Sequence, residues 1–213
     1  MAGAAIVGAT PVPGFICPTR RKDVVPLPFV HGACCGGLFF ENSDKPPAAG
    51  RMDYAACAGD GTVVNDAGPG WGADATYAFN PSKTCTGITF QRSEVKINDV
   101  LDGTANTLMV AERFIEPKFY ESGTKTDDDQ HAFVGHDHDT LRWTNASYPP
   151  LRDKDLGSAA NTLTFSFGSL HSAGFNAAFA DGSVRTIRYE ISTIVYETLG
   201  NRKDGKAISA GSF

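Results

Sequence analysis

The stretch Phe175-Asn-Ala-Ala-Phe-Ala-Asp-Gly-Ser-Val-Arg-Thr-Ile-Arg-Tyr189 carries the clearest structural signal in the sequence. Two segments with strand-like alternation flank Asp181-Gly182. This dipeptide suits the tight loop of a hairpin, in which both central residues need a positive φ. The stretch therefore predicts a β-hairpin. A two-residue turn gives a register that places Phe179 opposite Val184, a favourable cross-strand pair of an aromatic and a β-branched residue.

Further strands are predicted on the N-terminal side of this hairpin. Residues 107–114 form an apolar run that fits a strand buried on both faces. Residues 163–167 alternate between apolar and polar side chains, and residues 87–90 have the composition of a short strand. Consecutive strands joined by turns usually pair side by side. We therefore expect an antiparallel sheet with long loops.

A short helix is predicted after the hairpin. Ser192 is suited to its N-cap and Gly200 to its C-terminal end. The expected apolar stripe consists of Ile194, Val195 and Leu199. The predicted fold class is thus α+β and β-rich, with an antiparallel sheet and a short C-terminal helix.

The length of 213 residues fits one domain, residues 1–213, with a sizeable core. Residues 1–85 are rich in Pro and Gly and are predicted as a loop region without long regular elements. Residues 86–213 are predicted as the sheet core, interrupted by a solvated acidic loop at residues 121–140. No stretch approaches the ~20 apolar residues of a membrane span, so none is predicted in this chain.

The cysteines and the net charge restrict the possible partners and compartments. The net charge is -5 and no basic face is evident, so we expect no nucleic-acid partner. None of the cysteines forms a Cys-x-x-Cys pair, and all lie in the first 85 residues: Cys17, Cys34, Cys35, Cys57 and Cys85. An oxidising compartment would allow two bridges at most. Reduced, buried thiols are an equally open interpretation.

The loop at 121–140 holds the densest group of candidate metal ligands in the sequence. They are Asp127, Asp128, Asp129, His131, His136, Asp137, His138 and Asp139. The carboxylates suit calcium, whereas two histidines spaced i, i+2 on a strand would share a face and suit a transition metal. No known calcium-loop motif is matched, and a solvated loop without metal is the favoured interpretation. Calcium is the cofactor that this loop would admit.

His171 and Asp181 resemble a general acid–base pair, but the predicted strand between them argues against one. An extended stretch at ~3.3 Å per residue keeps the two side chains roughly 20 Å apart. Asp181 is therefore predicted to form the turn, and His171 to anchor backbone from another segment. The sequence also lacks a Gly-x-Ser-x-Gly elbow and a phosphate-binding Gly-x-x-x-x-Gly-Lys. We expect no catalytic residues and no enzymatic activity.

Several motifs occur in an order that is specific as a set. They are Phe15-Ile-Cys-Pro-Thr-Arg-Arg21, Asp53-Tyr-Ala-Ala-Cys-Ala-Gly59, Asp102-Gly-Thr-Ala-Asn-Thr107 with Glu112, the segment from Phe167 to Val184, and Asp204-Gly205. In the fourth motif, nine residues separate His171 from Asp181-Gly182. Together the motifs resemble a domain-of-unknown-function family that is abundant in planctomycete bacteria. Its members usually begin with a prepilin-type N-terminal helix.

This resemblance implies a pilin-like or pseudopilin-like head domain with a structural signature. The signature residues are Cys17, Asp53, Asp102, Gly103, Asn106, Glu112, His171, Asp181 and Gly182. The implied location is the cell surface or the extracellular space, with the periplasm as an alternative. The hydrophobic N-terminal helix of pilins is absent from the sequence as given. Related pseudopilins hold calcium in a loop near the sheet, which also bears on the acidic loop.

Three hypotheses about function follow. The first is a structural pilin-like protein that associates with itself or with other pilin-like subunits through its β-rich head. The second is an extracellular glycan- or metal-binding module that uses the acidic loop and loop aromatics. The third is a metal-dependent hydrolase, which would need converging ligands and an open coordination position.

Overall fold

The computed structural model describes residues 2–21, 27–28, 44, 46–62, 77, 84–154, 156–157, 165–209 and 211–213. Its α-helices are α1, Ala2–Ala9, and α3, Thr193–Gly200. Its 3-10 helices are η1, Pro13–Phe15, η3, Ile97–Asp99, η4, Thr104–Asn106, and η5, Pro117–Phe119. Its strands are β1, Leu27–Pro28, β2, Ala48–Ala49, β3, Tyr54–Cys57, β4, Leu108–Glu112, β5, Leu141–Arg142, β6, Leu151–Arg152, β7, Gly168–Ser169, β8, Phe175–Phe179, and β9, Val184–Ile187.

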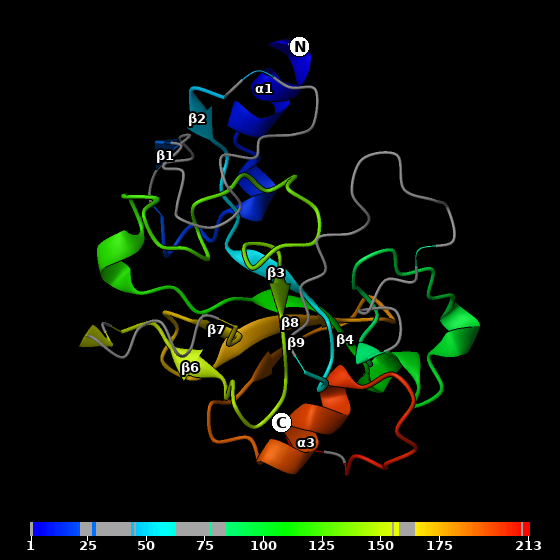
Figure 1. Ribbon diagram of the computed structural model, residues 1–213. Helices are drawn as coiled ribbons and strands as arrows, with labels where there is room; N and C mark the ends of the chain where they lie inside the picture. The colour runs from blue at the N-terminus through cyan, green and yellow to red at the C-terminus, as the bar shows by residue number, and fades with distance from the viewer. Residues whose placement is uncertain are drawn as a thin grey trace.

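The central feature is a five-stranded sheet with the order β5-β3-β4-β8-β9. The predicted α+β, β-rich fold with a short C-terminal helix is confirmed. The sheet is mixed rather than wholly antiparallel, because β5 runs parallel to β3. Two further pairs lie outside this sheet, β1 with β2 and β6 with β7. In Figure 1, α1 lies at one end of the molecule and α3 at the opposite end.

The core lies on one face of the sheet, and α3 packs against it. Strand β8 alternates as predicted, with Phe175, Ala177 and Phe179 buried and the side chain of Asn176 exposed. Tyr196 and Leu199 of α3 belong to the same buried cluster. Strand β4 lies between β3 and β8, which agrees with its apolar composition. Burying these side chains is the main stabilising contribution of the sheet.

The hairpin is present, but its register differs by one residue from the predicted one. Ala178 lies opposite Val184 and Phe175 opposite Ile187. The Phe179 amide donates to the Ser183 carbonyl, and the Gly182 amide donates to the Phe179 carbonyl. Gly182 alone takes a positive φ of 84° in this loop, so the turn has three residues with a bulge at its last position. The extra residue explains the shifted register.

Other expectations for local structure were wrong. Residues 87–90 form no strand. In α3, Ile194 is 69% exposed, so Tyr196 rather than Ile194 completes the buried face of this helix. Ser192 does cap this helix by accepting a hydrogen bond from the Val195 amide. Strand β3 comes from the predicted loop region 1–85, because its small side chains at Ala55 and Cys57 fit the core. Of the predicted strand 163–167, residues 163–164 lie outside the described residues.

Candidate functional site

Three members of the predicted signature meet at one point, although they are far apart in the sequence. Cys17 follows η1, Glu112 ends β4, and His171 lies in the loop between β7 and β8. One ligand-type atom from each lies within 4.8 Å of the others. We call Cys17, Glu112 and His171 the Cys–Glu–His cluster. Among the residues that the structure describes, no other group of three Cys, His, Asp or Glu side chains converges in this way.

A single nitrogen of His171 faces both partners. His171 Nε2 lies 3.2 Å from Glu112 Oε1 and 3.9 Å from Cys17 Sγ. Glu112 Oε1 is buried and has no hydrogen-bond partner among the described groups. The His171 side chain is 34% exposed, so the cluster reaches solvent on that side. The prediction that His171 anchors backbone was wrong, because its ring faces a carboxylate and a thiol.

The three side chains are held by fixed backbone around them. The second oxygen of Glu112, Oε2, accepts a hydrogen bond from the Asn176 amide at 2.7 Å. The backbone amide of Cys17 donates to Asp53 Oδ2 at 2.8 Å. The Tyr189 hydroxyl lies 3.0 Å from the His171 carbonyl and 2.8 Å from the Ser169 carbonyl, which ties down the loop before β8. The cluster is therefore preorganised rather than formed by mobile side chains.

The remaining signature residues other than Asp53 gather at a different place. The amide of Asp181 donates to the Thr104 carbonyl, next to Gly103 and Asn106. The Asp102 carboxylate accepts hydrogen bonds from the amides of Asp204 and Gly205. Asp181 itself accepts a bond from the Ser183 amide, so its predicted role in the turn is confirmed. These residues connect the hairpin turn, η4 and the C-terminal segment.

Beside the cluster lies a buried group of arginines and carboxylates, which we call the arginine–aspartate network. Its members are Arg20, Arg21, Asp53, Arg113, Lys125, Asp127, Asp128, Arg142 and Asp153. Arg21 bridges Asp53 and Asp128 at 2.9 and 2.7 Å. Arg142 pairs with Asp127 at 2.9 Å, and Arg113 pairs with Asp128. Asp53 connects the network to the cluster, because it binds both Arg21 and the Cys17 amide.

Charge compensation within the network decides the protonation of its members. Burial alone would raise the pKa of Asp128, but the charges of Arg21, Arg113 and Arg51 overcome it and lower that pKa. Burial lowers the pKa of Arg142 to about 10 against the opposing charge of Asp127, so it remains protonated at neutral pH. The carboxylates of Asp153 and Asp53 raise the pKa of Arg20 despite its burial. Asp128, Arg142 and Arg20 are therefore ionised at neutral pH.

The prediction of a solvated loop at residues 121–140 was wrong, because much of this segment is buried. Buried members include Lys125, Asp127, Asp128, Asp129, Gln130, His131, Asp139 and Thr140. Burial of an unpaired carboxylate would be costly, but Lys125 and Arg142 compensate the charge of Asp127, and Arg21 compensates that of Asp128. The sequence pattern of the loop itself carries no sign of the arginine partners.

The eight residues predicted as metal ligands do not converge on one point, although all of them lie in the described part of the chain. His136 and His138 lie in a bend and a turn, so the strand that would align them is absent there. Burial lowers the pKa of His131 and of His138, and His138 packs edge-on against Phe165. Burial also raises the pKa of Asp139 well above its ordinary value.

The described cysteines other than Cys17 behave as small apolar residues. Burial raises the pKa of Cys57 to about 12 and that of Cys85 to about 11, so both are protonated thiols at neutral pH. Cys17, Cys57 and Cys85 are free and buried. Cys34 and Cys35 lie outside the described residues.

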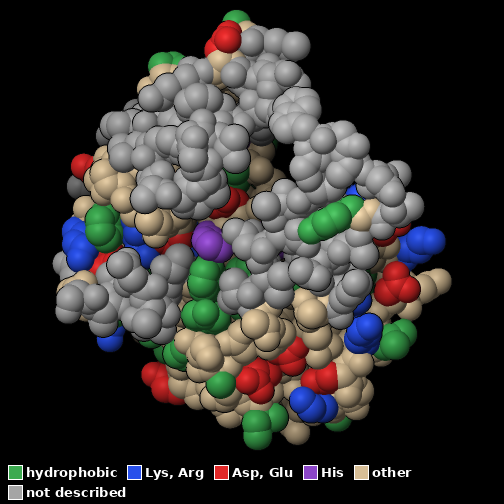
Figure 2. Space-filling view, viewed as in Figure 1, with side chains coloured by type: hydrophobic (Ala, Val, Ile, Leu, Met, Phe, Trp, Pro, Cys, Tyr) green, Lys and Arg blue, Asp and Glu red, His purple; other side chains and the backbone are tan. Residues whose placement is uncertain are grey.

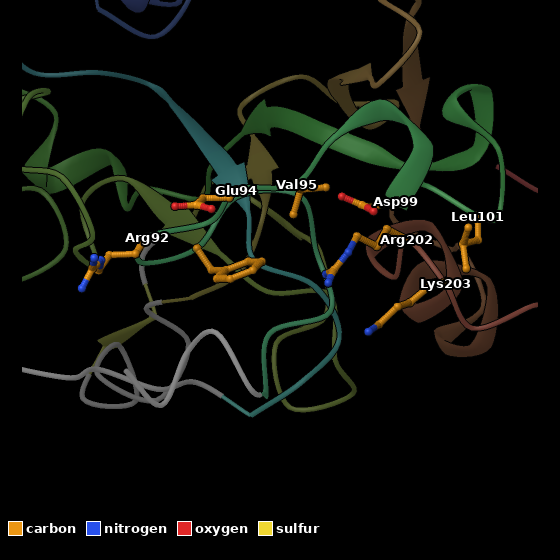
Figure 3. Close-up of a pocket in the computed structure, with 8 residues that line it drawn as sticks. Arg92, Glu94, Val95, Asp99, Leu101, Arg202 and Lys203 are labelled. Carbon is orange, nitrogen blue, oxygen red and sulfur yellow. The ribbon is translucent and has the colours of Figure 1, made fainter. Parts of the chain in front are cut away.

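A surface hollow of about 400 Å³ near Phe90 is lined by both acidic and basic side chains, which do not converge on one point. Figure 3 shows Arg202 and Lys203, from the segment after α3, on the same hollow as Glu94 and Asp99. The Arg202 guanidinium is already engaged in hydrogen bonds, since it donates to the Cys85 and Gly87 carbonyls. Figure 2 likewise shows acidic and basic side chains interspersed on the face in view. The Cys–Glu–His cluster is therefore the better candidate site.

The motifs contained part of the signal for this cluster. Each of its three residues stands in a motif that the sequence singled out, but the spacing within each motif says nothing about contact between motifs. The partners that define the network, Arg113 and Arg142, had no signal of this kind. A search for a thiol, a carboxylate and an imidazole in separate motifs could have suggested the cluster.

The fold and the site together define an α+β, β-rich domain whose mixed sheet positions one Cys–Glu–His cluster. The chain matches the family described as Protein of unknown function (DUF1559) over residues 2–193 and belongs to it. No curated protein and no solved structure matches the chain. None of the described helices is both long and apolar enough to cross a membrane.

Proposed function

We propose that this chain is a structural, pilin-like protein of the cell surface or extracellular space that associates with further copies of itself. The observation that carries the proposal is the apolar helix α1. Its sequence contains no charged residue, and Ile6 and Val7 are 65% and 49% exposed. Exposed apolar side chains that lie together on one element are typical of interaction sites.

The position of α1 supports association at one end of the molecule. The Gly50 amide donates to the Gly8 carbonyl at 2.9 Å, which fastens the end of α1 beside β2. Gly8 also lies directly against the ring of His131, where no larger residue would fit without a shift. The helix is thus held by its C-terminal end, while Ile6 and Val7 stay exposed. Figure 1 shows this helix at the end opposite α3.

The size of α1 sets the expected strength of association. Stable protein interfaces bury more than about 1,000 Å² in total, which an eight-residue helix alone does not supply. We therefore expect weak, concentration-dependent association through α1 and the surface around it. A pilin-like array would gain its stability from many such contacts in series.

The proposal assigns no reaction to the chain. The ionisable side chains of the arginine–aspartate network bind one another, and this supports a structural role. A nucleophile–base–acid relay also needs two different imidazole nitrogens, one for the nucleophile and one for the carboxylate. In the cluster the same nitrogen, His171 Nε2, faces both Cys17 and Glu112.

Sedimentation velocity over a wide range of concentrations tests the proposal. The weight-average mass of the 213-residue chain should rise with concentration, and the double variant Ile6→Ser/Val7→Ser should stay monomeric. Ile194→Ser is the matched control, because Ile194 is 69% exposed but lies on α3. The proposal fails if the wild type is monomeric throughout, or if the control reduces association as much as the double variant does.

A further inference from the structure

We propose that the Cys–Glu–His cluster is a binding site for a divalent transition metal, with Zn²⁺ as the best-fitting ion. The ligand atoms would be Cys17 Sγ, Glu112 Oε1 and His171 Nε2. This site is different from the acidic loop in which the sequence suggested a metal. It is also independent of self-association through α1.

The two distances from His171 Nε2 are close to the edges of a zinc tetrahedron, and the third pair, Cys17 Sγ and Glu112, lies within 4.8 Å. With ordinary zinc–ligand lengths, tetrahedral geometry places a nitrogen and an oxygen about 3.3 Å apart and a nitrogen and a sulfur about 3.6 Å apart. The observed separations are 3.2 Å for His171 Nε2 to Glu112 Oε1 and 3.9 Å for His171 Nε2 to Cys17 Sγ. An inward movement of the thiol would bring the three ligand atoms to tetrahedral spacing.

The buried oxygen of Glu112 supplies a second, independent observation. Glu112 is 1% exposed, and its Oε1 is buried without a hydrogen-bond partner in the described structure. A carboxylate oxygen in this position is costly unless a charge or a donor compensates it. Its neighbour Oε2 is already bonded to the Asn176 amide, so Oε1 is held pointing at the thiol and the imidazole. A cation between the three atoms would compensate the buried charge.

The mixture of ligand types selects the metal. Calcium and magnesium prefer oxygen ligands alone, whereas thiolate and imidazole suit zinc and related transition metals. Three protein ligands leave one tetrahedral position for water or an external ligand. The partly exposed side of His171 gives access to it. The backbone bonds that hold Cys17 and Glu112 are the outer-shell support that metal sites normally have.

A metal in this position would join three separate parts of the chain. Cys17 belongs to the N-terminal segment that carries α1, Glu112 to the central strand β4, and His171 to the loop before β8. The metal would therefore fasten the N-terminal segment to the sheet. It should raise the stability of the folded chain, since it binds the folded state and not the dispersed ligands.

The test uses the full chain after treatment with EDTA. Equilibrium dialysis against ZnCl₂ should load one zinc per chain, and zinc should raise the melting temperature. Co²⁺ in its place should give a thiolate-to-cobalt charge-transfer absorption in the near ultraviolet. Cys17→Ser and His171→Ala should each weaken zinc binding by at least about tenfold, as expected for the loss of a direct ligand.

Two further variants keep the result interpretable. Glu112→Gln retains an acceptor for the Asn176 amide but removes the carboxylate charge. This variant should therefore fold normally, yet its zinc affinity should be at least about tenfold lower than that of the wild type. Cys85→Ser and His136→Asn change a thiol and an imidazole outside the cluster and should leave zinc binding unchanged. The proposal is overturned if folded wild type takes up no zinc, if the cobalt complex lacks the thiolate band, or if the cluster variants bind as the wild type does.

Discussion

The arginine–aspartate network and the Cys–Glu–His cluster are neighbours, yet they differ in how their charges are compensated. In the network, the Asp127 and Asp128 carboxylates each face two cationic side chains. In the cluster, Glu112 Oε1 is buried beside a thiol and one imidazole nitrogen without forming a hydrogen bond in the described structure. The Asp127 and Asp128 carboxylates are thus compensated by cationic protein groups, whereas Glu112 Oε1 has no hydrogen-bond donor in the described structure.

This difference separates two uses of buried polar residues. A satisfied ionic network fixes the positions of the segments that it joins, and removal of one member leaves an uncompensated charge. An unsatisfied carboxylate in a preorganised cluster is typical of a site for a ligand. The motif at residues 15–21 serves both regions, because Cys17 enters the cluster while Arg20 and Arg21 enter the network. Mutations can separate the two roles.

The largest effect is expected for Arg113→Met. Arg113 pairs with Asp128 and also donates to the Met52 and Asp127 carbonyls. Its loss leaves a buried carboxylate with less compensation and should lower the free energy of unfolding by about 3–5 kcal/mol, measured by urea denaturation. Lys206→Met is the control, since the Lys206 side chain is 55% exposed and its pair with Asp204 should contribute little. Equal effects of the two variants would contradict the structural role of the network.

Asp128→Asn should cost about 2 kcal/mol at neutral pH, because it removes charge-assisted hydrogen bonds to Arg21 and Arg113. The folded pKa of Asp128 is lowered. Its ionised form therefore adds stability that is fully present above its unfolded pKa of about 3.9 and is lost as pH falls through the folded pKa. Urea denaturation at a series of pH values should show the gap between variant and wild type narrowing in acid. A gap that does not depend on pH would refute this assignment.

Asp139→Asn should raise the free energy of unfolding, whereas Asp128→Asn should lower it, although both aspartates are buried. Burial raises the pKa of Asp139, so its stabilising contribution is present below about pH 3.9 and is lost as pH rises through the folded pKa. Asparagine imitates the protonated carboxyl and retains an acceptor for the Gln130 amide. We expect a gain of about 1 kcal/mol at neutral pH and none in acid, measured by thermal and urea unfolding. A loss at neutral pH would show that Asp139 is ionised and paired.

The smallest effect is expected for Glu112→Gln in metal-free protein. The amide oxygen can still accept the hydrogen bond from the Asn176 amide. Because Glu112 Oε1 makes no hydrogen bond within the described structure, the loss of charge should change the free energy of unfolding by less than about 1 kcal/mol. Urea denaturation in EDTA measures this change. A loss as large as that of Asp128→Asn would mean that Glu112 has a structural role like the network carboxylates.

The sequence by itself determined the β8–β9 hairpin and the start of α3. Alternation around Phe175–Phe179 defined β8, Asp181-Gly182 located the turn, and Ser192 located the start of α3. These features depend on neighbouring residues, so a short window contains their causes. The one-residue error in register arose because a three-residue loop with Gly182 in its last position uses the same dipeptide as a two-residue loop.

Only the tertiary structure decided which polar residues are buried together. Arg21 reaches Asp128, and His171 reaches Glu112 and Cys17, across long separations in the chain. A carboxylate-rich segment has the composition of a solvated loop unless cations from other segments compensate it, and that compensation is a property of packing. The sequence therefore named the members of the signature, while the fold decided that Asp181 stabilises a turn and that His171 belongs to the cluster.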